Sequence, residues 1–195
     1  MIPAHTGFYA GEYLPPLSRV WAMELSTPLS WTELGPLACP VSAASAAVLG
    51  GRLYVFGGYS ATGTTDTVQV YDPASRSWSL APPLPAPRRK TACVVLRNLL
   101  YVLGGRGRRG SATCTVFVYD ATTSEWSTST PLPFAEENLY GVAFDGRLVV
   151  MPERGEPLVL GADGRWSTEI LPPLPSLWGA CTNLRAASLS LRPHP

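Results

Sequence analysis

Apolar residues occur in short runs of four to six positions, rich in Val, Leu, Tyr and Thr, and Gly, Pro, Asp, Ser or Arg bounds each run. Runs of this length and composition are typical of β-strands rather than helices. In one well-marked stretch the pattern predicts four strands, at residues 90–96, 99–104, 113–119 and 125–129. The connections at 97–98 and 120–124 are short and carry turn residues, which favours antiparallel hairpins.

This four-strand pattern recurs with a period close to 48 residues. Leu-Tyr-Val-Phe-Gly-Gly at 53–58 returns as Leu-Tyr-Val-Leu-Gly-Gly at 100–105, and Val-Gln-Val-Tyr-Asp at 68–72 returns as Val-Phe-Val-Tyr-Asp at 116–120. A tryptophan marks the last strand of each unit, at Trp31, Trp78, Trp126 and Trp166. Four antiparallel strands repeated at this interval describe the blade of a β-propeller, which must stack on its neighbours to bury both faces.

The order of double glycine, Tyr-Asp and Trp resembles the kelch repeat, and the resemblance covers roughly residues 20–175. It implies an all-β fold: a kelch-type β-propeller built from four-stranded antiparallel blades, incomplete on this chain. The repeated residues are expected to be structural. The glycines suit positions where a positive φ or a close backbone excludes a Cβ, and the aromatic rings suit the space between blades. These residues are Gly57, Gly58, Tyr71, Trp78, Gly104, Gly105, Tyr119, Trp126 and Trp166.

The repeat predicts five segments along the chain. Residues 1–37 hold an N-terminal segment and a half blade, 38–86 and 87–134 are complete blades, 135–175 form a degenerate blade, and 176–195 begin a further blade or form an irregular tail. In the degenerate blade Pro152-Glu153 replace the double glycine, and no Tyr-Asp precedes Trp166. The half blade is expected to lack its first two strands.

Kelch propellers usually close with five to seven blades, so the resemblance implies that this chain alone does not close a ring. Three arrangements stay open: a truncated product of a longer gene, open edges capped by another chain or by self-association, and a compact small propeller. Exposed blade edges would favour self-association.

Composition narrows the function classes. Only 15% of the residues are charged and the net charge is +1, so the chain as a whole is not a polyelectrolyte. No run of 18 apolar residues offers a membrane span, and the first ten residues do not read as a secretory signal. Cys39, Cys93, Cys114 and Cys181 are too scattered for a zinc site, and they are expected to be reduced. A cytoplasmic location is the resulting expectation.

The sequence offers little for catalysis. Its two histidines, His5 and His194, lie in predicted tails, so neither a His-based nucleophile system nor the histidine ligands of kelch copper oxidases can be assembled. Adjacent Glu136-Glu137 are expected to be solvated. The glycine-rich stretch 104–110 is not followed by Gly-Lys-Ser/Thr or a helix, which argues against a phosphate-binding loop. No enzyme, cofactor or metal is therefore predicted.

Loop geometry predicts one candidate ligand-binding face. In a four-stranded meander, loops between the second and third strands emerge at the same end as loops joining one blade to the next. Six positive charges gather there, although 14 of the 15 basic residues are arginine, so biased composition and solvated surface are competing interpretations. The predicted face comprises Arg88, Arg89, Lys90, Arg106, Arg108, Arg109, Tyr59, Ser60 and Asn138.

The resemblance implies that this face grips a protein or an acidic or phosphorylated peptide through its arginines. Nucleic acid is not expected, because no aromatic residues are interleaved with the basic ones. The sequence thus predicts a non-enzymatic protein-interaction module, either recognising substrates in a ubiquitin-ligase adaptor or acting as a cytoskeletal or signalling scaffold. The BTB or F-box module that recruits a ligase is absent from the chain. The alternatives are a sugar-processing kelch enzyme (isomerase or oxidase) and a truncated isoform without its own ligand.

Overall fold

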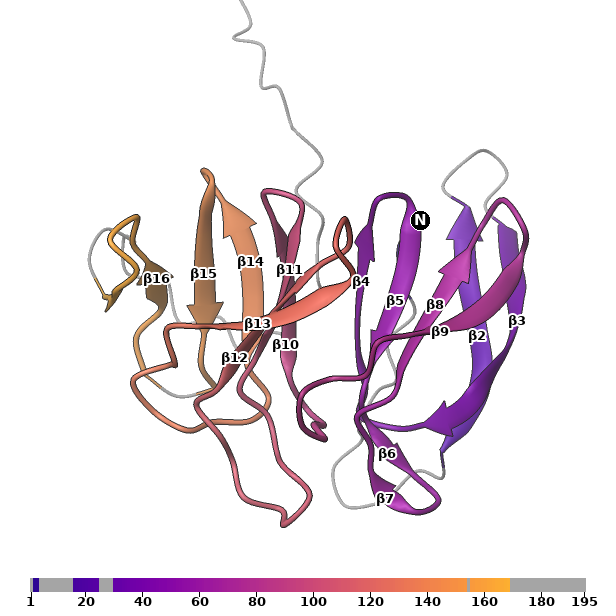
Figure 1. Ribbon diagram of the computed structural model, residues 1–195, viewed down its shortest axis with the longest axis horizontal. Helices are drawn as coiled ribbons and strands as arrows, with labels where there is room; N and C mark the ends of the chain where they lie inside the picture. The colour runs from indigo at the N-terminus through magenta and orange to yellow at the C-terminus, as the bar shows by residue number, and fades with distance from the viewer. Residues whose placement is uncertain (1, 4–15, 25–29, 154, 169–195) are drawn as a thin grey trace, which may run out of the picture.

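The computed structural model describes residues 2–3, 16–24, 30–153 and 155–168, and within them every regular element is a β-strand in an antiparallel sheet (Figure 1). The predicted all-β class is confirmed. None of the described segments contains a helix that could cross a membrane. The segment 176–195 and the two histidines lie outside the described residues, as does Cys181.

Three sheets have four strands each, in simple sequential order. Blade 1 consists of β4 (Ser45–Leu49), β5 (Arg52–Phe56), β8 (Val68–Asp72) and β9 (Ser77–Ala81). Blade 2 consists of β10 (Ala92–Leu96), β11 (Leu99–Leu103), β12 (Val116–Asp120) and β13 (Glu125–Ser129). Blade 3 consists of β14 (Tyr140–Phe144), β15 (Arg147–Met151), β16 (Leu158–Leu160) and β17 (Trp166–Ser167). A two-stranded hairpin, β6 (Tyr59–Ser60) and β7 (Gly63–Thr64), lies between β5 and β8.

The N-terminal sheet differs from the expected half blade. It has three strands, β1 (Ile2–Pro3), β2 (Leu17–Glu24) and β3 (Ser30–Val41), in the order β1-β2-β3. The expectation that both preceding strands are missing is therefore wrong, because β1 pairs antiparallel with Ala22 and Met23. A two-residue strand carries no repeat landmark, so the sequence pattern could not show it. β3 also continues past residue 37, to Val41, which pairs with Leu17 after two register shifts.

The tight turns follow from local sequence. In each blade the first hairpin has two central residues with positive φ: Gly50-Gly51, Arg97-Asn98 and Asp145-Gly146. This pair of conformations belongs to the turn whose twist matches that of the flanking strands, and Gly and Asn adopt it at low cost. The turn between the third and fourth strands opens with an aspartate. Asp72 and Asp120 each accept a backbone N–H two residues on, at 2.8 Å.

Blade 3 keeps this design without the Tyr-Asp landmark. Asp163 accepts the N–H of Arg165 at 3.0 Å, so it provides the turn-forming carboxylate from a different position. Its third and fourth strands are only three and two residues long, compared with five in blades 1 and 2. The degenerate unit thus forms a complete, smaller blade.

The hydrophobic core lies between sheets rather than within one. One cluster joins blades 1 and 2 and includes Phe56, Leu100 and Tyr119, while a second joins blades 2 and 3 through Leu103 and Leu148. The tryptophan of each fourth strand donates its Nε1–H to the backbone of the preceding sheet. Trp78 bonds to Leu34 and Gly35 at 3.2 Å, Trp126 to Pro82 at 3.0 Å, and Trp166 to Thr130 at 3.1 Å. Each ring therefore fills the space between blades and satisfies its polar atom there.

Large apolar side chains remain exposed mainly at the two end sheets. Trp21 and Trp31 lie on the N-terminal sheet, and Tyr140 and Phe144 lie on β14. On β2 the half-buried Val20 and the buried Ala22 face blade 1. Side chains alternate along a strand, so Trp21 points away from blade 1.

Candidate ligand-binding face

Four loops meet at one end of the molecule: 57–67, 82–91, 104–115 and 130–139. β6, β7 and the long loop between β11 and β12 project together from the lower edge in Figure 1. Backbone hydrogen bonds join the loops. Arg89 and Arg106 exchange two of them, at 3.0 and 2.8 Å, and Asn138 donates to the carbonyl of Lys90 at 3.1 Å. We call the surface of these four loops the loop face.

The double glycines permit this close meeting of backbones. Gly58 donates its N–H to the carbonyl of Arg88 at 2.8 Å, and Gly105 donates to that of Glu136 at 2.8 Å. All four glycines of the two motifs have positive φ. A Cβ at Gly104 would lie 2.7 Å from the carbonyl oxygen of Glu136, far inside van der Waals contact. Glycine is needed here because both the conformation and the close neighbour exclude a side chain.

Two of the six predicted binding cations are paired with a carboxylate. Glu137 Oε2 lies 2.5 Å from Arg106 Nε and 3.3 Å from Lys90 Nζ, and its side chain is only 19% exposed. Burial alone would raise the pKa of Glu137. Hydrogen bonds from Arg106 and Lys90, together with their positive charges, lower it by more than burial raises it, so the pKa of Glu137 lies below its ordinary value. This carboxylate binds the connection from blade 2 to blade 3 to the two preceding loops.

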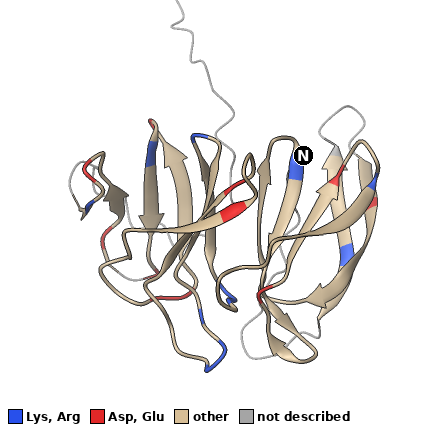
Figure 2. Cartoon of the chain, viewed as in Figure 1, with Lys and Arg blue, Asp and Glu red and all other residues tan. Residues whose placement is uncertain are grey.

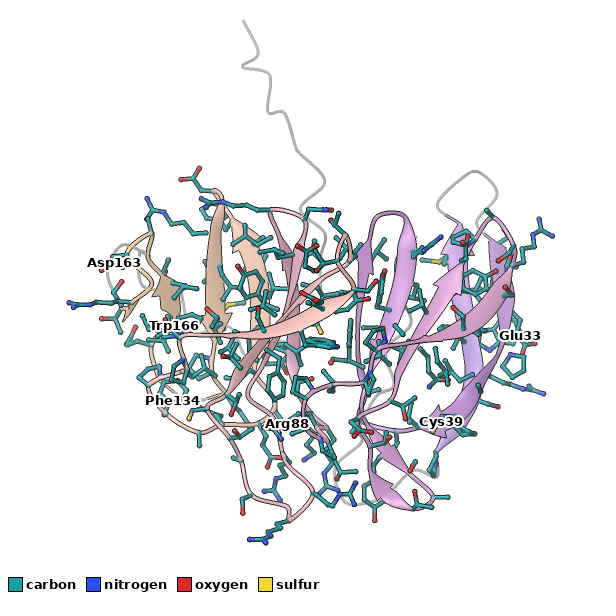
Figure 3. All side chains as sticks on the ribbon, in the orientation of Figure 1. Glu33, Cys39, Arg88, Phe134, Asp163 and Trp166 are labelled. Carbon is teal, nitrogen blue, oxygen red and sulfur yellow. The ribbon has the colours of Figure 1, made fainter. Side chains whose placement is uncertain are left out.

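Arg88 and Arg89 contact aromatic rings. The Arg88 guanidinium lies 5.1 Å from the centre of the Phe117 ring and donates from Nη1 to the carbonyl of Pro87 at 2.9 Å. Burial lowers the pKa of Arg88. In Figure 3 its label lies between blades 1 and 2, near the loop face. Arg89 lies 5.0 Å from the Tyr59 ring centre and donates to Thr64 Oγ1 at 3.4 Å. Arg88 therefore packs its loop against β12, and Arg89 joins the same loop to the β6–β7 hairpin.

Arg108 and Arg109 differ from the other four. Both side chains are exposed at the tip of the loop from β11 to β12, and neither forms an ion pair with any residue the structure describes. Figure 2 shows blue at the lowest point of this loop. Their charges face solvent, so they are available to an anionic partner at little desolvation cost.

A polar pocket of about 350 Å³ lies beside Arg108. The β6–β7 hairpin and the residues that follow it supply most of its wall, including several hydroxyl groups and one carboxylate. It is lined by Tyr59, Thr62, Gly63, Thr64, Thr65, Asp66 and Arg108. The pocket thus offers hydroxyl donors and acceptors with one charge of each sign.

The remaining predicted residues take different positions on the loop face. Tyr59 is half-buried and lines the pocket. Ser60 is buried, and its hydroxyl donates to the carbonyl of Gly63 at 3.0 Å inside the hairpin. Asn138 is exposed with φ +57°. The structure brings the predicted loops to one end, but among the predicted residues only Arg108, Arg109 and Asn138 are exposed, and the others are buried or half-buried.

The described residues contain no group of three or more His, Cys, Asp or Glu that could hold a metal ion. Cys93 is buried, and burial raises the pKa of its thiol to about 12, which makes it a poor nucleophile. Cys39 and Cys114 are free thiols.

Three features of this region were not predicted from sequence. Glu137 was expected to be solvated, whereas it pairs with two of the expected binding cations. The β6–β7 hairpin and the pocket beside it have no repeat signal. Gln69 is buried at 1% exposure, and its amide bonds to both the N–H and the carbonyl of Cys39, at 2.9 and 2.8 Å. The only signal for Gln69 was its difference from Phe117, one period later.

Comparisons with known proteins agree with this architecture. The structure of YjhT superposes with a TM-score of 0.69 over 82% of this chain and 60% of that chain, at 18% sequence identity, which is a likeness of fold. Kelch-like protein 21 of Danio rerio is 50% identical over 48 residues, which are 24% of this chain and 8% of that protein. The chain thus corresponds to part of each of these proteins.

A family model of the KLHDC2/KLHL20/DRC7 kelch-repeats domain matches residues 8–151, well over half of the chain. Its range covers blades 1 and 2 and ends with the second strand of blade 3. With the repeated glycine, tyrosine–aspartate and tryptophan positions and the stacked four-stranded sheets, this match shows that the chain belongs to the kelch-repeat family.

Proposed function

We propose that the chain is a non-enzymatic protein-interaction module whose loop face binds a protein or peptide bearing acidic or phosphorylated side chains. Membership of the kelch-repeat family supports a propeller used for protein interaction. The observation that carries the acidic preference is the pair Arg108 and Arg109, exposed and without ion-pair partners among the described residues.

Four of the six cations stabilise the loops and two face solvent, and this difference supports a defined binding contact. Arg88, Arg89, Lys90 and Arg106 contact rings, hydroxyls or Glu137, and these contacts hold the loops in place. Arg108 and Arg109 project into solvent from the loops that these contacts hold in place. A guanidinium forms paired hydrogen bonds with a carboxylate or phosphate, so two of them on one loop suit an acidic segment. The adjacent pocket can receive a polar side chain of the same partner.

A peptide panel tests the proposal. We expect fluorescently labelled acidic and phosphoserine peptides to bind saturably, with affinity that falls as salt rises, while neutral and basic peptides of the same length do not bind. The double variant R108Q/R109Q should lose this binding. R76Q/R97Q removes two exposed arginines from turns at the opposite end and is the matched control. Equal binding by both variants would contradict the proposal.

The cellular setting is a separate part of the proposal. Substrate recognition in a ubiquitin-ligase adaptor, a cytoskeletal or signalling scaffold, and a cytoplasmic location are all compatible with a peptide-binding propeller. Partner identification by proximity labelling with the wild-type chain and R108Q/R109Q separates these settings. Partners lost specifically in the variant would define which applies.

We also propose self-association through the exposed apolar residues of the end sheets. Trp21 and Trp31 point away from the core at one end, and Phe144 is 59% exposed at the other. Light scattering across a concentration series should show a mass that rises with concentration in the wild type. The same series on W21S/W31S should show the monomer mass throughout, and an unchanged rise would contradict this surface.

A further inference from the structure

The sequence contains two matches to the pattern Arg-Arg-x-Ser/Thr, at 88–91 and at 108–111. Protein kinases select substrates partly by charge pattern, and two arginines two and three positions before a hydroxyl residue are an arginine-directed signal. The candidate acceptors are Thr91 in Arg-Arg-Lys-Thr and Ser111 in Arg-Arg-Gly-Ser. The two matches are equivalent in sequence, but their structural environments differ.

Thr91 is half-buried, and its hydroxyl is already hydrogen-bonded. Its Oγ1 lies 2.6 Å from Ser45 Oγ in a partly buried hydrogen bond, and its methyl group packs against Gly105. The arginine three positions earlier, Arg88, is half-buried over the Phe117 ring. A kinase would have to break the junction of blades 1 and 2 to reach this hydroxyl.

Ser111 has the opposite environment. Its side chain is exposed, and its hydroxyl forms no hydrogen bond with any described residue. Arg108 and Arg109 are exposed in the same loop, and neither forms an ion pair within the described part of the chain. Two backbone hydrogen bonds close the loop tip. Gly107 donates to the carbonyl of Ser111 at 3.0 Å, and Gly110 donates to the carbonyl of Gly107 at 3.0 Å. This tip can therefore open without disturbing a core.

We propose that Ser111 is a phosphorylation site for an arginine-directed serine/threonine kinase, and that Thr91 is not. In the reaction, Ser111 Oγ forms a bond to the γ-phosphorus of ATP while the bond between that phosphorus and the β–γ bridging oxygen breaks. ADP leaves, and the hydroxyl proton passes to the catalytic aspartate of the kinase.

The modification would act on the loop face, a consequence that rests on the proposed function. A phosphoserine carries roughly −1.5 to −2 charges at neutral pH, which offsets the two charges of Arg108 and Arg109. The phosphate would also compete for their guanidinium groups, because they lie within three residues of it. Phosphorylation should therefore release an acidic ligand.

The first experiment tests the site. The folded chain is incubated with ATP, Mg²⁺ and the catalytic subunit of cAMP-dependent protein kinase, and mass spectrometry locates the phosphate. We expect about one phosphate per chain at Ser111 and none at Thr91. S111A should abolish labelling, and S124A, which removes an exposed serine without preceding arginines, should not. R108Q/R109Q should slow labelling about tenfold or more.

Synthetic peptides distinguish the effect of the fold on phosphorylation from the effect of the local sequence. Synthetic peptides of residues 85–94 and 105–114 should both be phosphorylated, whereas only Ser111 is modified in the folded chain. Labelling of Thr91 in the folded chain would overturn the proposal. So would an unmodified Ser111 in the folded chain beside rapid labelling of peptide 105–114.

The second experiment tests the consequence. The phosphorylated chain should bind the acidic peptide at least about tenfold more weakly than the unmodified chain. If the acidic peptide binds neither form, the proposed function fails while the Ser111 assignment stands on the labelling result. If both forms bind it equally, the regulatory consequence is overturned and the proposed function stands.

Discussion

Blades 1 and 2 have the same landmarks and the same strand register, yet they present different chemistry at the loop face. Between its second and third strands, blade 1 carries the hydroxyl-rich β6–β7 hairpin, whereas blade 2 carries a glycine- and arginine-rich loop. At matching positions of the third strand, blade 1 has Gln69 and blade 2 has Phe117. Repeated residues thus fix the strands and turns, whereas the residues that do not repeat give each blade its own loop chemistry and its own contacts with neighbouring sheets.

The largest effect should come from a repeated glycine. Gly104 and Gly110 both have positive φ, at +60° and +77°, but only Gly104 is crowded, by Glu136 and Leu139. We expect G104A to lose about 3 kcal/mol of unfolding free energy or to fail to fold, and G110A to lose about 1 kcal/mol. Urea unfolding measures both. Equal losses would show that conformation alone, and not the close approach of blade 3's loop, sets the requirement.

A smaller effect should follow from the position that differs between the blades. In Q69L the N–H and carbonyl of Cys39 lose their partners, and both are backbone groups of β3 beside a buried side chain. We expect a loss of about 2 kcal/mol, because unsatisfied buried polar groups are costly. F117L, which removes the ring contacts with Arg88 and Trp126 but no hydrogen bond, should lose about 1–1.5 kcal/mol. If Q69L were the milder change, the amide would not be what holds β3 to blade 1.

The Glu137 cluster should give a pH-dependent effect. Because the pKa of Glu137 is lowered in the folded chain, its charged form stabilises the fold above the ordinary value of 4.5, and this stability is lost as pH falls through the lowered pKa. E137Q should lose about 1–3 kcal/mol at pH 7. Its disadvantage should shrink as the pH falls below 4.5, which urea unfolding at several pH values can follow. A constant difference from pH 7 to pH 3 would contradict the ion-pair account.

The smallest effect on stability should come from the exposed arginines. R108Q/R109Q should change the unfolding free energy by less than about 0.5 kcal/mol, because neither side chain has a partner among the described residues. R106Q, by contrast, should destabilise the chain by removing the contact with Glu137. A large loss in R108Q/R109Q would place these residues with the structural cations.

The sequence predicts the repeated parts of the fold well, because short-range turn chemistry and strand patterning are local. The four strands of blade 2 begin and end within three residues of the predicted bounds, and the turn at Arg97-Asn98 has the expected hairpin form. Glu137 could not be assigned to Arg106 and Lys90 in this way, because that pairing depends on the distance between loops 30 to 50 residues apart. The residues of the hairpin at 59–64 are not repeated at 106–112, where one antiparallel bridge joins Arg106 and Ala112, so periodicity gives no signal for the pocket beside that hairpin.

Hydrogen–deuterium exchange of the chain with and without an acidic phosphopeptide tests the central claim most directly. If the non-repeated loops bind the ligand, exchange should slow at 59–67 and 104–115 and stay unchanged at the opposite turns, 50–51, 97–98 and 145–146. The same peptide should cause no slowing in R108Q/R109Q. Protection at the opposite turns, or equal protection in the wild type and the variant, would contradict the assignment of ligand binding to the loop face.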